Sequence, residues 1–219
     1  MGIIITIAQQ KGGAGKTTIA AQLATALAAE DLEVATLDAD PQGSLSLWYA
    51  ARTAALPGDR NTIIHAPVQG WRLKKEAERY SSECDVVVID SPPHTDSEST
   101  IAIRAADLVL IPIQPSPLDV WASRSTIKAA QEEGREVLII MNRVLPRTKL
   151  TGAIASKLEE LGVSAAKAML GSRVSYVSSL MEGKGVVETE GKSSAAVKEI
   201  RALAKEILKH KSVKLAKAA

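Results

Sequence analysis

The sequence predicts a doubly wound α/β fold, in which a mostly parallel sheet carries helices on both faces. Two observations support this expectation: apolar runs of strand length alternate with helical patterns, and these runs are apolar at successive positions. Strands that are buried on both sides of a parallel sheet have such runs of Val, Ile and Leu. Alternation of strand and helix is the order that builds a doubly wound sheet. The chain has no internal repeat and no low-complexity linker, so we expect one domain over residues 1–219.

The expected strands coincide with the apolar runs Ile3–Ala8, Val34–Asp38, Val86–Asp90, Leu108–Gln114 and Val137–Asn142. Helical patterns cover Thr17–Glu30, Val68–Tyr80, Leu118–Glu133 and Leu150–Leu161. In the first of these helices, Ile19, Leu23 and Leu27 recur every four residues and form one core-facing stripe.

Composition excludes several classes of protein. The chain has 219 residues, of which 46% are hydrophobic and 24% charged, as in globular rather than disordered or fibrous proteins. Its single cysteine, Cys84, excludes a disulfide framework and any zinc or iron–sulfur cluster held by this chain alone. No apolar run approaches the roughly 18 residues of a membrane span, and Met1–Ala8 is too short and uncharged for a signal peptide. We therefore expect a soluble cytoplasmic protein.

A glycine-rich segment, Gln10–Thr18, lies between the first expected strand and the first expected helix. This context is the one that a phosphate-binding loop requires, because backbone N–H groups and the helix N-terminus converge on phosphate oxygens. Lys16 is placed to reach the β- and γ-phosphates, and the Thr17 hydroxyl to ligate Mg²⁺. The usual motif has glycine six residues before the lysine, where this chain has Gln10. The alternative is a glycine-rich turn without a ligand.

The departure from the usual motif resembles the deviant Walker A motif of the ParA/MinD family of ATPases, with a second lysine at Lys11. Further segments resemble motifs of that family in the same order. They are Thr36–Gly43, Val86–Pro93, Pro112 with Pro115–Asp119, and Asn142–Arg143. The resemblance is strongest to the small ParA-type partition ATPases, covers about residues 2–143, and implies a P-loop NTPase fold with ATP and Mg²⁺ as ligands.

The resemblance also implies roles for individual residues. Lys11 would reach the partner's phosphates across an ATP-dependent homodimer, Asp40 would orient the attacking water, and Asp38 would support Lys11 and the first switch. Asp90 would hold Mg²⁺ through water. The nucleotide-contacting set would be Gly12, Gly13, Ala14, Gly15, Lys16, Thr17, Thr18, Pro112, Asn142 and Arg143. The alternative role for the aspartates is ordinary turn or strand-end capping, and the upstream loop favours catalysis.

The same resemblance implies slow hydrolysis without a stimulating ParB-like adaptor. Among the branches of the family, a single cysteine disfavours the nitrogenase iron protein. A phosphate loop that begins at residue 9 leaves no room for an N-terminal helix-turn-helix domain, so we expect no operator-specific binding. Ligase chemistry like that of dethiobiotin synthetase stays open as an alternative.

The C-terminal segment is basic. Residues 192–219 hold eight basic and two acidic residues, a net charge of +6, and the remaining 19 basic and 23 acidic residues give −4. This asymmetry predicts either a polyanion-binding surface or a solvated helix face. By the resemblance, non-specific double-stranded DNA on the nucleoid is the expected partner. Candidate contacts are Arg173, Lys198, Arg201, Lys205 and Lys209, with Lys211, Lys214 and Lys217 further along.

A basic amphipathic helix from about residue 193 leaves a second possibility. Val197, Ile200, Leu203, Ile207 and Leu208 form an apolar stripe that could lie on a membrane, as in a MinD-like protein. The region lacks the aromatic anchors of interfacial helices, so docking on the sheet is favoured. Similarly, Trp48, Trp71 and Trp121 are far apart in the sequence, and core or interface packing is favoured over base stacking.

Overall fold

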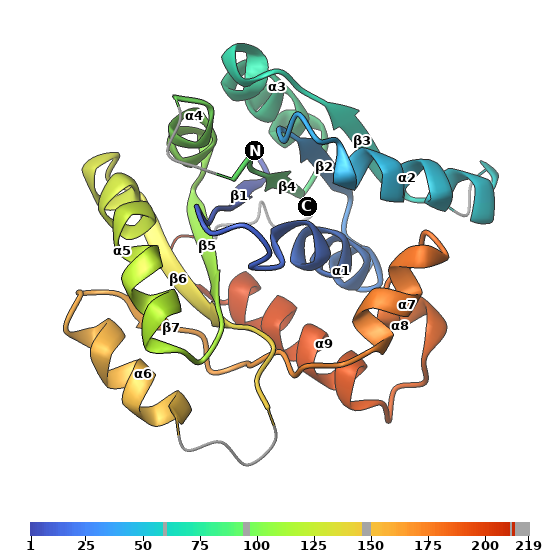
Figure 1. The fold of residues 1–219 in the computed structure, drawn as a ribbon. Coiled ribbons are helices and arrows are strands. Elements are labelled where there is room, and N and C mark those ends of the chain that lie inside the picture. The colour runs from blue at the N-terminus through green and yellow to red at the C-terminus, as the bar shows by residue number, and fades with distance from the viewer. Residues whose placement is uncertain (59–60, 94–96, 146–149, 211, 213–219) are drawn as a thin grey trace.

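A seven-stranded, all-parallel sheet forms the centre of the computed structural model, which describes residues 1–58, 61–93, 97–145, 150–210 and 212 (Figure 1). Its strands lie in the order β3-β2-β4-β1-β5-β6-β7. Their bounds are β1 Ile3–Ile7, β2 Val34–Asp38, β3 Ile63–Pro67, β4 Val86–Asp90, β5 Leu108–Ile113, β6 Glu136–Met141 and β7 Ser164–Ala165. The order changes direction on either side of β1, as a doubly wound sheet requires. The predicted fold class is confirmed.

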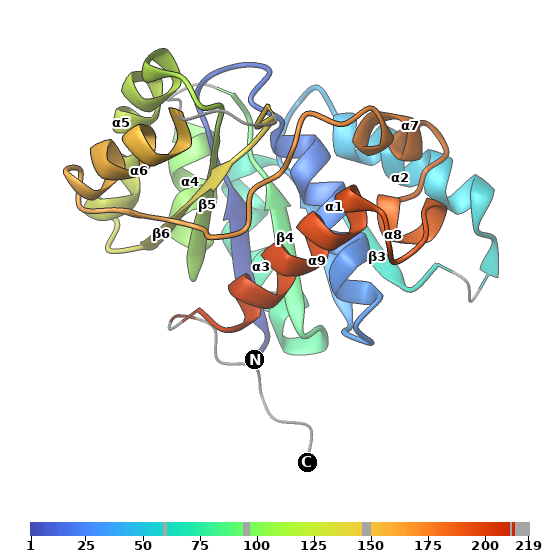
Figure 2. The same cartoon turned by 90° about the horizontal axis from the view of Figure 1, so that it is seen from below.

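Helices cover both faces of the sheet (Figures 1 and 2). One face is covered by α1 Lys16–Ala28, α2 Ser44–Ala55, α7 Ser175–Met181, α8 Val186–Thr189 and α9 Ala195–Leu208. The other is covered by α3 Gly70–Glu83, α4 Ser97–Ala105, α5 Pro117–Glu132 and α6 Leu150–Glu159. Successive strand residues point to opposite faces, so continuously apolar strands supply a core to each helix layer.

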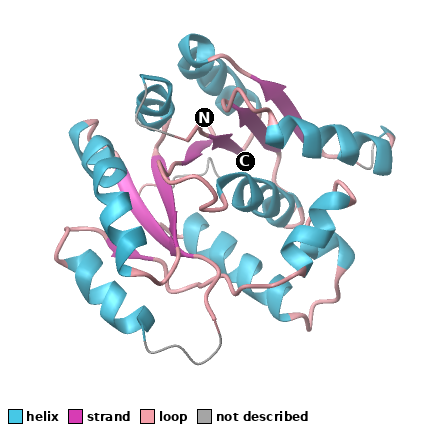
Figure 3. Cartoon of the chain, in the orientation of Figure 1, coloured by secondary structure: helices cyan, strands magenta, loops and turns pink. Residues whose placement is uncertain are grey.

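Every strand and helix that the sequence predicts is present, with ends that coincide or differ by at most three residues. The sequence did not predict α2, β3, α4, β7, α7 or α8. Of these, β3 is an edge strand whose residues are mostly half-buried or exposed, and β7 has two residues. Such elements lack the continuous apolar run by which central strands are recognised. Figure 3 shows the strands at the centre of the molecule with the helices around them.

The C-terminal helix α9 is docked on the body of the molecule. Val197, Ile200, Leu203 and Ile207 are buried in the core that α9 shares with α1, and Leu208 packs at its edge. Docking is confirmed, and this apolar stripe is not available to a membrane surface. Lys211, Lys214 and Lys217 lie outside the described residues. Within the described part of the chain, every helix is too short or too polar to cross a bilayer.

Candidate nucleotide site

The carboxyl ends of four strands bring the predicted site residues to one edge of the sheet. The loop from Gln9 to Gly15 joins β1 to α1 at this edge, and Asp38 and Asp90 end the neighbouring strands β2 and β4 in direct register. Asn142 follows β6 on the other side of the loop. Parallel α/β sheets bind ligands at this edge, where the strand order changes direction.

The loop backbone has the shape that its glycines permit. Gly13 and Gly15 have φ angles of 74° and 95°, a left-handed conformation that side chains rarely adopt. A Cβ at Gly15 would lie 2.6 Å from Nδ2 of Asn142, which donates a 2.9 Å hydrogen bond to the Ala14 carbonyl. By contrast, no described atom lies within 4 Å of the Cβ positions of Gly12 and Gly13. Asn142, which follows β6, therefore holds one side of the loop, and the space around Gly12 and Gly13 is open to phosphates.

Lys16 is the first residue of α1 and is 8% exposed. Its Nζ donates a 3.1 Å hydrogen bond to the Gln9 carbonyl, which holds the ammonium beside the loop. Burial lowers the pKa of Lys16, and the negative charges of Asp90 and Asp40 counteract this effect. A buried cation that lacks a close carboxylate partner favours an anionic ligand, because the ligand would compensate its lost hydration.

Asp90 is the most buried charged group of the site, with 0% exposure. No hydrogen bond of normal geometry reaches either carboxylate oxygen from the described residues. Burial raises the pKa of Asp90 to about 7, while the Thr17 hydroxyl and Lys16 lower it and Asp38 raises it. A buried, unpartnered carboxylate next to a hydroxyl fits a Mg²⁺ site, because oxygen ligands and water suit this ion. Asp90 and Thr17 are the residues that would hold it.

Asp38 and Asp40 form a hydrogen-bonded turn after β2. Asp38 Oδ1 accepts from the Asp40 N–H at 3.2 Å, and Asp40 Oδ1 accepts from the Gln42 N–H at 2.9 Å. Both aspartates therefore make the turn contacts expected of capping residues. They also line a cavity of about 580 Å³ together with Trp71 and Glu98, so the same carboxylates border open space.

Lys11 is paired within its own chain. Its Nζ lies 2.8 Å from Oδ2 of Asp119 in the first turn of α5, and the Asp119 side chain is almost fully buried. To reach a partner's phosphates as predicted, Lys11 must leave this ion pair. Sequence reasoning placed Asp119 in a family motif and assigned it no role.

The remaining predicted contacts occupy varied positions. Pro112 is buried, and its carbonyl accepts a 3.3 Å hydrogen bond from Gln9 Nε2. Thr18 is half-buried in α1. Arg143 is exposed after β6 with a left-handed φ of 53°. Hydrogen bonds thus join Pro112 and Asn142 to the phosphate loop, and Arg143 follows Asn142 directly.

The five candidate DNA contacts divide into two groups. Arg173 forms a bidentate ion pair with Glu199, and Arg201 lies 2.7 Å from Glu30, so both guanidinium groups bind the body of the protein. The three lysines are exposed: Lys198 and Lys205 lie on α9, and Lys209 follows its last residue. Of the tryptophans, Trp48 is buried and packs in the core as expected, and Trp71 and Trp121 are exposed.

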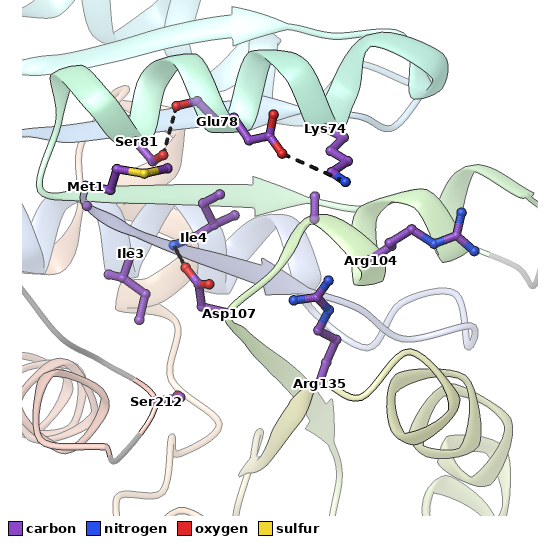
Figure 4. Close-up of a pocket in the computed structure, with 12 residues that line it drawn as sticks. Met1, Ile3, Ile4, Lys74, Glu78, Ser81, Arg104, Asp107, Arg135 and Ser212 are labelled. Atoms are coloured by element: carbon purple, nitrogen blue, oxygen red, sulfur yellow. Dashed lines mark hydrogen bonds and ion pairs between the residues drawn. The ribbon is translucent and has the colours of Figure 1, made fainter.

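A separate cavity of about 480 Å³ lies at the opposite edge of the sheet, where β1 begins (Figure 4). Its polar lining is mixed in charge: Lys74 and Glu78 form an ion pair on α3, and Arg104, Asp107 and Arg135 also line the cavity. The amino ends of parallel strands are not where these folds bind ligands. We therefore place the nucleotide at the phosphate loop and not in this cavity.

Comparison with known proteins identifies the family. The profile of the family described as the CobQ/CobB/MinD/ParA nucleotide binding domain matches residues 5–193. The chain belongs to this family. A relative named "Maintenance of carboxysome distribution protein A", from Halothiobacillus neapolitanus, is 30% identical over 93% of this chain and 95% of its own length. "Protein ParA" from Rhizobium radiobacter is 30% identical, over 94% and 96%.

Solved structures of this family have the same fold. The cell division ATPase MinD of Pyrococcus furiosus superposes with a TM-score of 0.79 at 20% identity, over 95% of this chain and 99% of MinD. An ATP complex of a McdA variant from Cyanothece gives 0.75 at 21% identity, over 99% of both chains. The chain is therefore a nucleotide-binding protein of the ParA/MinD family and has the fold of these structures.

Proposed function

We propose that this chain is an ATP-hydrolysing positioning protein that dimerises around ATP, binds DNA without sequence preference, and is released by partner-stimulated hydrolysis. The observation that carries the proposal is the combination of Lys16, Asp90 and the open loop at one sheet edge. A buried cation, a buried orphan carboxylate and free helix-terminal N–H groups together suit a Mg²⁺–nucleotide. The names of two relatives at 30% identity add support, because one is a carboxysome distribution protein and the other is named ParA.

In the proposed reaction, the oxygen of a water attacks the γ-phosphorus, and the bond to the bridging β,γ-oxygen breaks. The water's protons end on phosphate and solvent. Lys16 neutralises the transferring group, and Asp40 orients the water from the turn after β2. Thr17 and Asp90 would hold Mg²⁺, which would offset negative charge on the phosphates. In this proposal, each of these residues either positions a reactant or compensates charge.

Dimerisation is supported by the surface around the site. Four exposed apolar side chains lie near the starts of α2, α3 and α5, the helices that follow the carboxyl ends of β2, β3 and β5, and we call them the apolar rim: Leu47, Trp71, Leu118 and Trp121. Trp71 is 77% exposed beside Asp38 and Asp40, and Trp121 is 59% exposed on α5, the helix that holds Asp119. Large exposed apolar side chains around a polar centre are typical of protein interfaces. A second copy seated there would cover the rim and meet Lys11.

The direct test is binding of a random-sequence duplex with ATP, ADP or no nucleotide, each at two salt concentrations. We expect tight binding with ATP only, weakening steeply with salt because lysines release counterions from the phosphate backbone. Lys16→Ala is the matched control, since it should remove the ATP-dependent state. Equal binding in all three nucleotide conditions, or none, would contradict the DNA-bound part of the proposal.

A further inference from the structure

A chain of hydrogen bonds links Asp38 to the edge of the sheet. Asp38 Oδ2 accepts from the Ser46 N–H at 2.8 Å and from the Ser46 hydroxyl at 2.7 Å. The same hydroxyl lies 3.0 Å from His65 Nε2, and His65 Nδ1 lies 3.0 Å from the Thr36 hydroxyl. This series of hydrogen bonds therefore connects β2, the first turn of α2, and β3.

The Asp38 carboxylate determines the direction of the Ser46 hydroxyl proton and, through it, of the proton on His65 Nε2. An ionised Asp38 only accepts, so the single hydroxyl proton of Ser46 points to Asp38. The Ser46 oxygen must then accept from His65, which requires a proton on Nε2. In neutral His65, Nδ1 is then an acceptor, and the Thr36 hydroxyl has two acceptors within reach, Nδ1 at 3.0 Å and the Ile64 carbonyl at 3.2 Å. The arrangement thus specifies the Nε2–H tautomer of His65.

The surroundings hold the imidazole in this orientation. The Tyr49 ring stacks on His65 with centroids 4.7 Å apart and planes 25° apart, and the Tyr49 hydroxyl donates to the Ile63 carbonyl at 3.0 Å. Burial lowers the pKa of His65, while the Asp38 charge counteracts this. Packing and burial therefore favour the neutral ring that the hydrogen bonds require.

We propose that Ser46 and His65 are positioning residues for Asp38 and, through it, for the Asp40 turn. Fixing Oδ2 from α2 leaves Oδ1 facing the Asp40 N–H, so the carboxylate of Asp40 is aimed by residues that do not touch the nucleotide. This inference rests on the proposed function for its catalytic consequence. Its structural part, the hydrogen bonding of Asp38, Ser46 and His65, can be tested without measuring ATP hydrolysis.

The first experiment reads the tautomer of His65 by nitrogen-15 NMR of the imidazole in the full chain, with His65→Gln identifying the signal. We expect the Nε2–H pattern at neutral pH. Ser46→Ala should remove the acceptor and mix the two tautomers. The Nδ1–H tautomer, or an unchanged signal in Ser46→Ala, would overturn the proposal.

The second experiment measures single-turnover ATP hydrolysis with protein in excess. Ser46→Ala keeps the backbone N–H that caps Oδ2 and loses only the hydroxyl, so a mere capping role would leave turnover unchanged. We expect the maximal single-turnover rate to fall about tenfold, with little change in the protein concentration that gives half of that rate, since loss of an outer partner of a functional group typically has an effect of this size. His65→Leu should behave alike, and Ser46→Thr and His65→Gln should restore most of the rate.

Ser44→Ala is the matched control, because Ser44 is exposed in the same helical turn. Equal rates for Ser46→Ala, Ser44→Ala and wild type would refute the positioning role. If the wild-type chain hydrolysed no ATP, the proposed function would fail, and the NMR measurement would still decide the hydrogen bonding.

Discussion

Two buried charged side chains at the carboxyl edge of the sheet form no ion pair among the described residues, whereas two arginines on the α9 face are held in ion pairs. At the edge, Asp90 is buried without a hydrogen-bond partner of normal geometry among the described residues, and Lys16 is held only by a carbonyl. On the α9 side, Arg173 is paired with Glu199 and Arg201 with Glu30. Buried unpaired charge opposes folding unless a ligand compensates it. The unpaired charges at the carboxyl edge therefore favour binding of a ligand, whereas the two arginines on the α9 side form ion pairs within the protein.

The largest expected effect comes from Lys16→Ala, because it removes the cation on which all nucleotide-dependent steps depend. Loss of a charged hydrogen-bonding group facing phosphates should weaken ATP binding by about 100-fold or more. Isothermal titration calorimetry measures the affinity. Lys128→Ala, an exposed lysine on α5, is the control. Retained ATP affinity in Lys16→Ala would contradict the assignment of the loop as the phosphate site. It would also contradict the idea that the unpaired charges at this edge serve a ligand.

Lys11→Ala should separate binding from hydrolysis. Because Lys11 is held by Asp119 in the single chain, its loss should leave some ATP binding. If it acts across the dimer like an arginine finger, stimulated turnover should fall by about 1000-fold. Phosphate release in single-turnover mixtures measures this rate. Unchanged turnover would show that Lys11 serves only its pair with Asp119.

Asp90→Asn tests whether the buried carboxylate costs stability before a ligand arrives. The folded-state pKa of about 7 lies above the unfolded value, so the folded chain binds this proton more tightly. Wild-type stability should therefore fall as pH rises from about 4 to about 7, and the variant should lack that slope. At about pH 8, the variant should be more stable by about 2–4 kcal/mol.

Chemical denaturation of the nucleotide-free protein at both ends of this pH range makes the comparison. Asp31→Asn, in an exposed turn with a left-handed φ of 61° that asparagine tolerates, is the control. A destabilised Asp90→Asn, or equal pH slopes in variant and wild type, would show that the carboxylate is compensated in the free protein.

The smallest effect is expected for the exposed lysines of α9. Reversing Lys205 and Lys209 to glutamate should weaken ATP-dependent DNA binding and make its salt dependence shallower by about one unit per lysine. Titrations at several salt concentrations measure the slope. The same reversals at Lys74 and Lys75, exposed on α3, are the control. Equal loss in both pairs would place the DNA elsewhere than on α9.

The sequence was sufficient for the central sheet and the phosphate loop, because both have local signals. Continuous apolar runs identify β1, β2, β4, β5 and β6, and glycine spacing identifies the loop. The edge strand β3 and helix α2 have no such pattern, so their contribution to the site was not predicted. The extent of the domain over residues 1–219 stays a prediction.

Contacts between distant residues were also beyond sequence reasoning. Asp119 is 108 residues from Lys11, and His65 is 19 residues from Ser46 on a strand that was not predicted. Conversely, Arg173 and Arg201 looked like free cations in the sequence, and only the fold reveals Glu199 and Glu30 beside them. Pairing across a fold depends on tertiary packing, which residue type and spacing do not encode locally.

The most direct test of the central claim is the mass of the protein in solution, measured by sedimentation with ATP, with ADP and without nucleotide. We predict a monomer in the last two conditions, and a dimer with ATP that Asp40→Ala makes long-lived by preventing hydrolysis. A monomer in saturating ATP, in both wild type and Asp40→Ala, would contradict the account.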